Sequence, residues 1–222
     1  MLLLFELILL LMKAKNELYF FKQLKQLAVH YKTGNLITEF KKANGKVCLL
    51  HQANCQFHVC NRHGKGVAYA IAKSFPEMVE AENLQLKSNP QEFYFGTFFS
   101  FEQSEDKFIV NLFSQKKFGS PEGIFDDYIL YGTTEEVIKH PNQAHLSDTF
   151  SDRCLALQSA LIKFKETFNK KYKVLIPLIA SGVAKHSSKK YLSDVDYFKK
   201  YIAPIIESAL VGHDVTVVIF DK

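Results

Sequence analysis

The chain has 222 residues, of which 47% are hydrophobic, and it carries a formal net charge of +5. This length and apolar content predict one large folded domain with a substantial core, and they exclude a disordered chain. The modest positive charge suits an anionic ligand, but solvated surface lysines account for it equally well.

The N-terminal run Met1–Met12 is apolar but too short to cross a bilayer. It contains Glu6, no basic segment precedes it, and no clear small-residue cleavage site follows it. A signal peptide or anchor and a natural start at Met12 are both compatible with this run. We treat residues 1–24 as an extension and expect a cytoplasmic protein without stable membrane association.

The cysteine and histidine pattern predicts neither a metal nor a cofactor. Cys48, Cys55 and Cys60 lie near three histidines, but no Cys-x-x-Cys pair and no second ligand cluster occur. Reduced thiols are therefore the expectation.

Apolar patterns predict strands and helices in alternation along the chain. We expect strands at 27–31, 47–51, 93–101, 107–113, 173–179 and 215–220, with 93–113 forming a hairpin or two adjacent strands. We expect one or two helical turns at 36–42 and a helix from about 67 that weakens near Pro76. Two further helices are expected at 150–168, capped by Ser147 or Asp148, and at 195–209, capped by Ser193.

This alternation predicts a three-layer α/β/α sandwich around a mixed, mostly parallel sheet. Loops at the carboxyl ends of parallel strands share one crevice, so segments 51–66, 113–119 and 180–185 should meet there. The long polar stretch from 114 to 147 is unusual in a compact domain and indicates a lid or an insertion.

Two glycines, Gly64 and Gly66, stand between a buried strand and a helix. Glycines let the backbone approach an anion closely, and the first N–H groups of the helix point toward it. This arrangement favours a phosphate-containing small molecule as the ligand.

Six segments occur in an order that resembles the macro-domain family. They are Thr33-Gly-Asn-Leu36, His51-Gln-Ala-Asn54-Cys55, Gly64-Lys-Gly-Val-Ala, Asn111-Leu-Phe-Ser-Gln115, Ile176-Pro-Leu-Ile-Ala-Ser-Gly-Val183 and the strand at 215–220. The resemblance covers residues 25–222 with an insertion at 120–146, and is closest to the branch with yeast-type ADP-ribose-1″-phosphate phosphatases, terminal-ADP-ribose glycohydrolases and phage macro proteins. It implies the three-layer macro-domain fold and ADP-ribose or its 1″-phosphate as ligand.

The resemblance also implies a set of binding residues. Gly64, Gly66 and Val67 would form the first phosphate- and ribose-binding loop, and Ser181, Gly182 and Val183 the second, through backbone N–H groups suited to a diphosphate. Asn54 would contact the distal ribose. Asn35 and the adjoining Leu36 would contact the adenine, and Phe220 would stack near that base. The alternatives are a simple turn at Asn35, a strand-end cap at Asn54 and a core position for Phe220.

His51 is the candidate catalytic residue, because the matching strand of the yeast-type phosphatase also ends in a histidine. Histidine suits proton transfer to a phosphate-ester oxygen near neutral pH, whereas a merely hydrogen-bonded histidine at a strand end is the alternative. The glycohydrolase residues are missing: no lysine occurs in 93–101, Ala184 and Lys185 replace the acidic residue, and Ala180 replaces a usual glycine.

We therefore predict a macro domain that binds ADP-ribose or ADP-ribose-1″-phosphate, with hydrolysis of the 1″-phosphate as a further hypothesis. The alternatives are a non-catalytic reader of ADP-ribosylated protein or nucleic acid, and an ADP-ribosyl glycohydrolase with atypical catalytic residues. Nucleic-acid binding through surface lysines is a weaker hypothesis, and the absence of a Walker motif argues against a Walker-type nucleotide hydrolase.

Overall fold

The computed structural model describes residues 29–55, 66–88, 95–116, 120–121, 148–169, 171–181 and 184–220. The extension at 1–24, the glycines Gly64 and Gly182, Val183 and nearly all of the 120–146 insertion lie outside these residues. In the described part of the chain, no helix is both long and apolar enough to cross a membrane.

Six strands form one sheet in the order β1-β6-β5-β2-β4-β3. Their bounds are β1 Val29–Thr33, β2 Val47–Asn54, β3 Thr97–Ser104, β4 Lys107–Gln115, β5 Lys173–Pro177 and β6 Val215–Ile219. Neighbouring strands run parallel except for β3 and β4, which form an antiparallel pair. The mixed, mostly parallel sheet expected from the sequence is confirmed.

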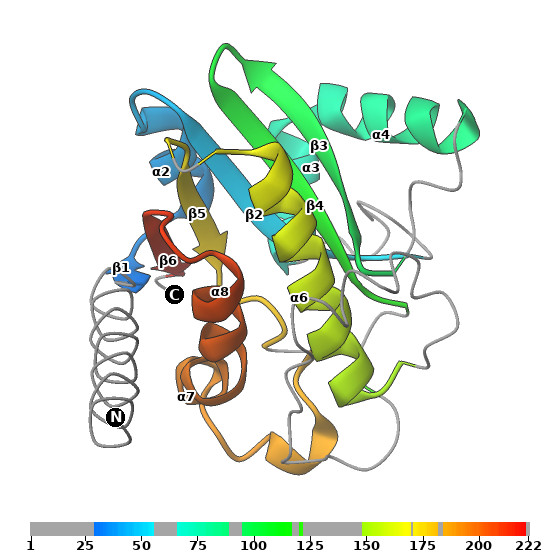
Figure 1. Cartoon of the computed structure of the whole chain (residues 1–222), viewed down its shortest axis with the longest axis vertical. Coiled ribbons are helices and arrows are strands. Elements are labelled where there is room, and N and C mark those ends of the chain that lie inside the picture. Colours follow the sequence, from blue (N-terminus) through cyan, green and yellow to red (C-terminus); the bar gives the residue numbers. More distant parts are fainter. Residues whose placement is uncertain are drawn as a thin grey trace, which may run out of the picture.

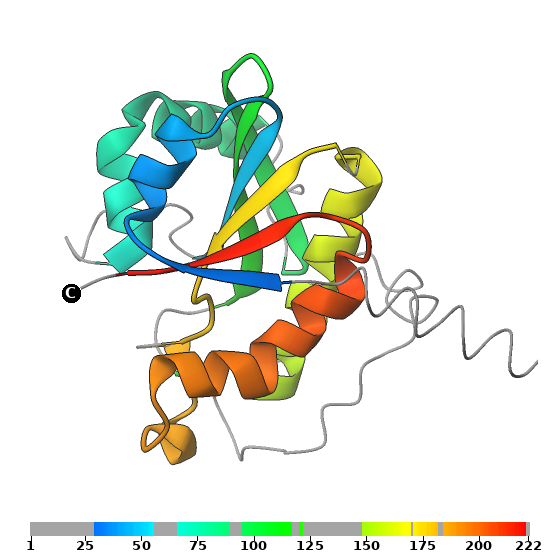
Figure 2. The same cartoon turned by 90° about the vertical axis from the view of Figure 1, so that its left-hand side faces the viewer.

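Helices cover both faces of the sheet and make three layers (Figures 1 and 2). One face carries α2 (Leu36–Lys42), α3 (Gly66–Ser74) and α4 (Pro76–Ser88). The other carries α6 (Phe150–Thr167), α7 (Asp194–Tyr197), the π-helical turn η4 (Phe198–Ile202) and α8 (Ala203–Ala209). A short 3-10 turn, η3 (Ser187–Lys189), precedes α7.

Two helix boundaries refine the sequence expectations. Pro76 separates α3 from a second helix, α4, which it opens; the first helical position suits proline because its missing N–H has no intrahelical partner there. The expected cap of α6 was wrong: Thr149, not Ser147 or Asp148, caps it in a capping box with Asp152. Ser193 caps α7 as predicted.

The alternation of side chains along β2 builds both halves of the core. Cys48 and Leu50 are buried in the cluster that α6 and α8 cover, whereas Val47 and Leu49 are buried in the cluster beneath α2, α3 and α4. Burial on both faces explains why β2 reads as a continuous apolar run in the sequence.

Candidate ligand-binding site

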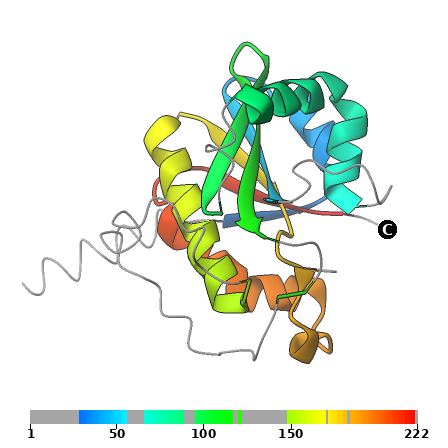
Figure 3. The same ribbon diagram turned by 90° about the vertical axis from the view of Figure 1, so that its right-hand side faces the viewer.

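The carboxyl ends of five strands meet along one edge of the sheet. Because β1, β6, β5, β2 and β4 are mutually parallel, the residues that follow them lie in a row. Asn54 and Ser181 fall on this edge, as the sequence predicted, and Asn35 and Phe220 lie on it too. Figures 2 and 3 show from opposite sides that α2 and α3, the helix that Gly66 opens, lie on the same face of the sheet.

Asn35 caps helix α2. Its Oδ1 accepts a hydrogen bond from the Thr38 backbone N–H at 3.1 Å, and the preceding Gly34 donates to the Ile219 carbonyl at 2.8 Å. Leu36 buries its side chain in the core, while its N–H, in the first helical turn, has no intrahelical acceptor. Asn35 therefore has a local role as a helix cap, where the sequence had suggested a simple turn, and its contact with an adenine stays a prediction.

Phe220 and the start of α3 present exposed surface at this edge. Phe220 is 66% exposed, so the alternative of a core position does not hold. Gly66 has a φ of +84°, a backbone conformation that glycine adopts without strain. Among the described residues, no atom beyond its chain neighbours and its own helix backbone lies within 4 Å of where its Cβ would be. Val67 is also partly exposed.

A β-bulge shapes the ends of β2 and β4. Ala53 pairs with Phe113 and Asn54 pairs with Gln115, which leaves Ser114 as the extra residue. Asn54 is buried here, and the Cys55 N–H donates to the Gln115 carbonyl at 2.8 Å. Burial raises the pKa of the Cys55 thiol to about 12, so it is not a thiolate nucleophile at neutral pH.

Gln52 joins the ends of three strands, a role that we did not predict from the sequence. Its Oε1 accepts from the Ala180 N–H at 2.8 Å, in the loop after β5, and its Nε2 donates to Ser114 Oγ at 2.9 Å, at the end of β4. The available signal was its spacing: Gln52 lies two residues before Asn54, so both side chains are on the same face of β2.

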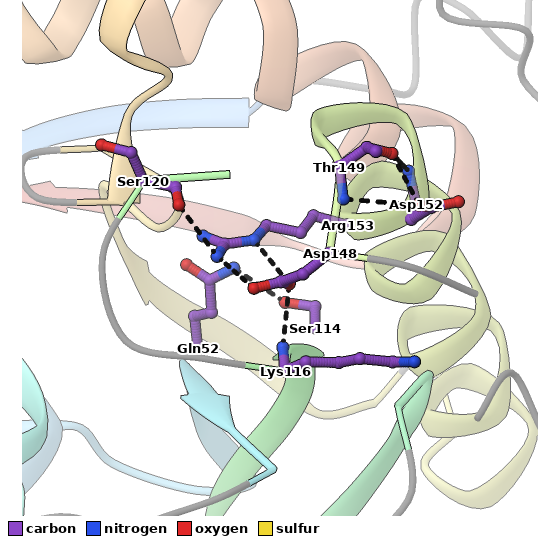
Figure 4. Close-up of polar contacts among 8 residues, drawn as sticks. All are labelled: Gln52, Ser114, Lys116, Ser120, Asp148, Thr149, Asp152 and Arg153. Atoms are coloured by element: carbon purple, nitrogen blue, oxygen red, sulfur yellow. Dashed lines mark hydrogen bonds and ion pairs between the residues drawn. The ribbon is translucent and has the colours of Figure 1, made fainter. Parts of the chain in front are cut away.

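A buried ion pair between Asp148 and Arg153 lies next to Gln52 and Ser114 (Figure 4). Arg153 Nε donates to Asp148 Oδ1 at 2.9 Å, and Arg153 Nη2 approaches Asp148 Oδ2 at 2.6 Å. The same carboxylate accepts from the Lys116 N–H at 3.0 Å, and Arg153 Nη2 also donates to the Ser120 carbonyl at 3.4 Å. The pair thus fastens the chain after β4 to the start of α6.

A small cavity opens between this ion pair and the loop after β5. Gln52, Arg153, Ala180 and Ala184 contribute to its walls, together with apolar side chains of α6 and η4. Its size allows about one water molecule. It is too small for a ligand, and the residues that line it support the ends of β2 and β5.

His51 lies three residues before the end of β2, and its side chain is on the face of the sheet that α2, α3 and α4 cover. It is 1% exposed, and its Nδ1 is 2.9 Å from the Gln52 carbonyl oxygen. Since a carbonyl only accepts, Nδ1 carries the proton of the neutral ring. Burial lowers the pKa of His51 to about 4, although the Gln52 carbonyl and the Asn111 side chain both favour the charged form. His51 is therefore neutral at physiological pH.

The side chain of Asn111 lies beside His51 and connects it to Glu82. Asn111 is its register partner on β4 and donates from Nδ2 to Glu82 Oε1 of α4 at 2.7 Å. Within the described residues, His51 Nε2 and Asn111 Oδ1 have no hydrogen-bond partner. The three side chains form a buried polar cluster in the core rather than part of an open crevice.

Two residues noted as departures from the macro-domain pattern have structural explanations. Ala180 has a φ of +56°, the left-handed region in which glycine is favoured. Lys185 is buried, and its Nζ contacts Asp194 Oδ1 at 2.8 Å and the Leu192 carbonyl at 2.7 Å. Lys185 therefore tethers the segment after the second loop to the start of α7. The described strand β3 contains no lysine, and the described residues hold no group of His, Cys, Asp and Glu able to bind a metal.

Comparison with protein-family models gave no match, and comparison with curated proteins gave none either. Comparison with solved structures found a macrodomain protein from Streptomyces coelicolor, 14% identical over 88% of this chain and 99% of its own, with a TM-score of 0.54. The macrodomain of Thermus aquaticus DarG is 16% identical over 88% and 99% of the two chains, with a TM-score of 0.50. A protein of unknown function from Bacteroides thetaiotaomicron is 19% identical over 88% and 98%, with a TM-score of 0.53. The chain therefore has the macrodomain fold.

Proposed function

We propose that this protein binds ADP-ribose or ADP-ribose-1″-phosphate at the carboxyl edge of its sheet. The observation that carries the proposal is the row of Asn35, Phe220, Ser181 and Asn54, which parallel strands bring to one edge. Their order matches the parts of the ligand that the macro-domain resemblance assigns to them, from adenine through diphosphate to distal ribose. The likeness of the fold to two solved macrodomains supports the same ligand class.

The exposed ring of Phe220 offers the sharpest test of where the ligand binds. Stacking of a base on an aromatic ring contributes about 1–3 kcal/mol, so Phe220→Ala should weaken ADP-ribose binding at least fivefold in titration calorimetry. Leu84→Ala is the matched control, because Leu84 is 68% exposed on α4 and should leave affinity unchanged. Absence of heat from the unaltered protein up to millimolar ADP-ribose would refute the proposal.

The geometry of His51 favours binding without hydrolysis, the reader function. A neutral, buried ring in a polar cluster of the core is poorly placed to exchange protons with a bound phosphate ester. Hydrolysis of the 1″-phosphate, the activity of the yeast-type branch, stays the second hypothesis. Phosphate release from ADP-ribose-1″-phosphate by the unaltered protein, abolished in His51→Gln with binding intact, would favour hydrolysis over reading.

A further inference from the structure

The loop after β5 adopts a backbone conformation that its own sequence does not favour. Ala180 has a φ of +56°, where its Cβ crowds the backbone, and only residues without a Cβ adopt this region freely. The next residue, Ser181, makes two local hydrogen bonds: its Oγ donates to the Leu178 carbonyl at 2.5 Å, and its carbonyl accepts from the Ala184 N–H at 3.2 Å. A strained residue persists only where its surroundings determine its conformation.

The side chain of Gln52 supplies such a determinant from a different strand. Its Oε1 accepts from the Ala180 N–H at 2.8 Å, a contact between residues 128 positions apart. The other end of the same carboxamide is fixed, because Nε2 donates to Ser114 Oγ at 2.9 Å (Figure 4). Since Ser114 is the fully buried extra residue of the β4 bulge, the amide cannot turn without losing this bond.

We propose that Gln52 is a positioning residue of the binding site, which holds Ala180 in its left-handed conformation and thereby fixes the position of Ser181. The inference rests on the proposed function for its effect on ADP-ribose, but the conformational part stands on the hydrogen bonds alone. Gln52 does not touch the ligand. It compensates for an alanine at a position where glycine would need no such support.

Amide hydrogen exchange measures the conformational part without any ligand. In Gln52→Met, which keeps the length of the side chain but removes its polar atoms, the Ala180 amide should exchange at least tenfold faster. Gln52→Glu should retain the protection, because a carboxylate oxygen accepts from the Ala180 N–H and the Ser114 hydroxyl can donate to the other oxygen. Gln103→Met is the matched control, since Gln103 lies toward the far end of β3 at the opposite edge of the sheet.

A double-mutant cycle with Ala180→Gly links this conformation to binding. Gln52→Met should weaken ADP-ribose binding at least fivefold, and by less than twofold in the Ala180→Gly background, since glycine adopts the loop conformation unaided. A merely structural contribution of Gln52 to the core would lower affinity or stability equally in both backgrounds.

The outcomes separate the two proposals. If the unaltered protein does not bind ADP-ribose, the proposed function fails while the exchange experiment still decides the role of Gln52. Unchanged Ala180 exchange in Gln52→Met, or an equal affinity loss in both backgrounds, would overturn the positioning role. If Gln52→Met does not fold, Ser114→Ala replaces it, and the Ala180 amide should then exchange at least threefold faster; an unchanged rate would overturn the role.

Discussion

The buried His51 makes the stability of this protein depend on pH in a way that can be calculated. Burial lowers its pKa from 6.5 to about 4 in the folded state, whereas the unfolded chain takes up the proton near 6.5. The contribution of neutral His51 to the unfolding free energy is therefore fully present above pH 6.5 and is lost as the pH falls toward 4. A difference of 2.5 pKa units corresponds to about 3 kcal/mol in total, of which about 2 kcal/mol is lost between pH 7.5 and pH 5.

Urea unfolding of the unaltered protein and of His51→Gln at both pH values measures this effect. Because glutamine does not titrate, the difference in unfolding free energy between the two proteins should shrink by about 2 kcal/mol on going from pH 7.5 to pH 5. Other titrating groups affect both proteins alike and cancel in the difference. Parallel pH curves for the two proteins would refute the burial of a neutral His51, and with it the argument against its catalytic role.

Two further substitutions test the support of the site and the base pocket. Asp148→Asn should lower the unfolding free energy by about 3–5 kcal/mol in urea, because it removes the carboxylate charge from a buried ion pair with Arg153. Asp106→Asn, which breaks an exposed pair with Lys46, should have a far smaller effect, and equal losses would contradict the reasoning. Asn35→Asp should keep the cap of α2, since both residues cap equally well, and its second carboxylate oxygen should accept from the adenine amino group. Calorimetry should then show about fivefold tighter ADP-ribose binding. Weaker binding would place the adenine elsewhere.

Most of the fold was predictable because its elements carry strong local signals. The continuous apolar run of β2, the helical spacing in α6 and the alternation of strands with helices each follow from burial on a sheet or helix face. Helix ends were less certain, since Thr149 rather than Asp148 caps α6. Asp148 pairs instead with Arg153, and a sequence pattern does not distinguish a capping carboxylate from one in an ion pair.

Sequence patterns were enough to predict the layered sheet and the edge on which Asn54 and Ser181 lie, because parallel strands bring their carboxyl ends to one edge of a sheet. The face of β2 that each polar side chain occupies became clear from the folded chain. The fold places His51 in the core beside Asn111 and Gln52 toward the loop after β5, since contacts between distant segments depend on strand order, register and the β4 bulge. The same long-range contact accounts for an alanine at a left-handed position that local propensity disfavours.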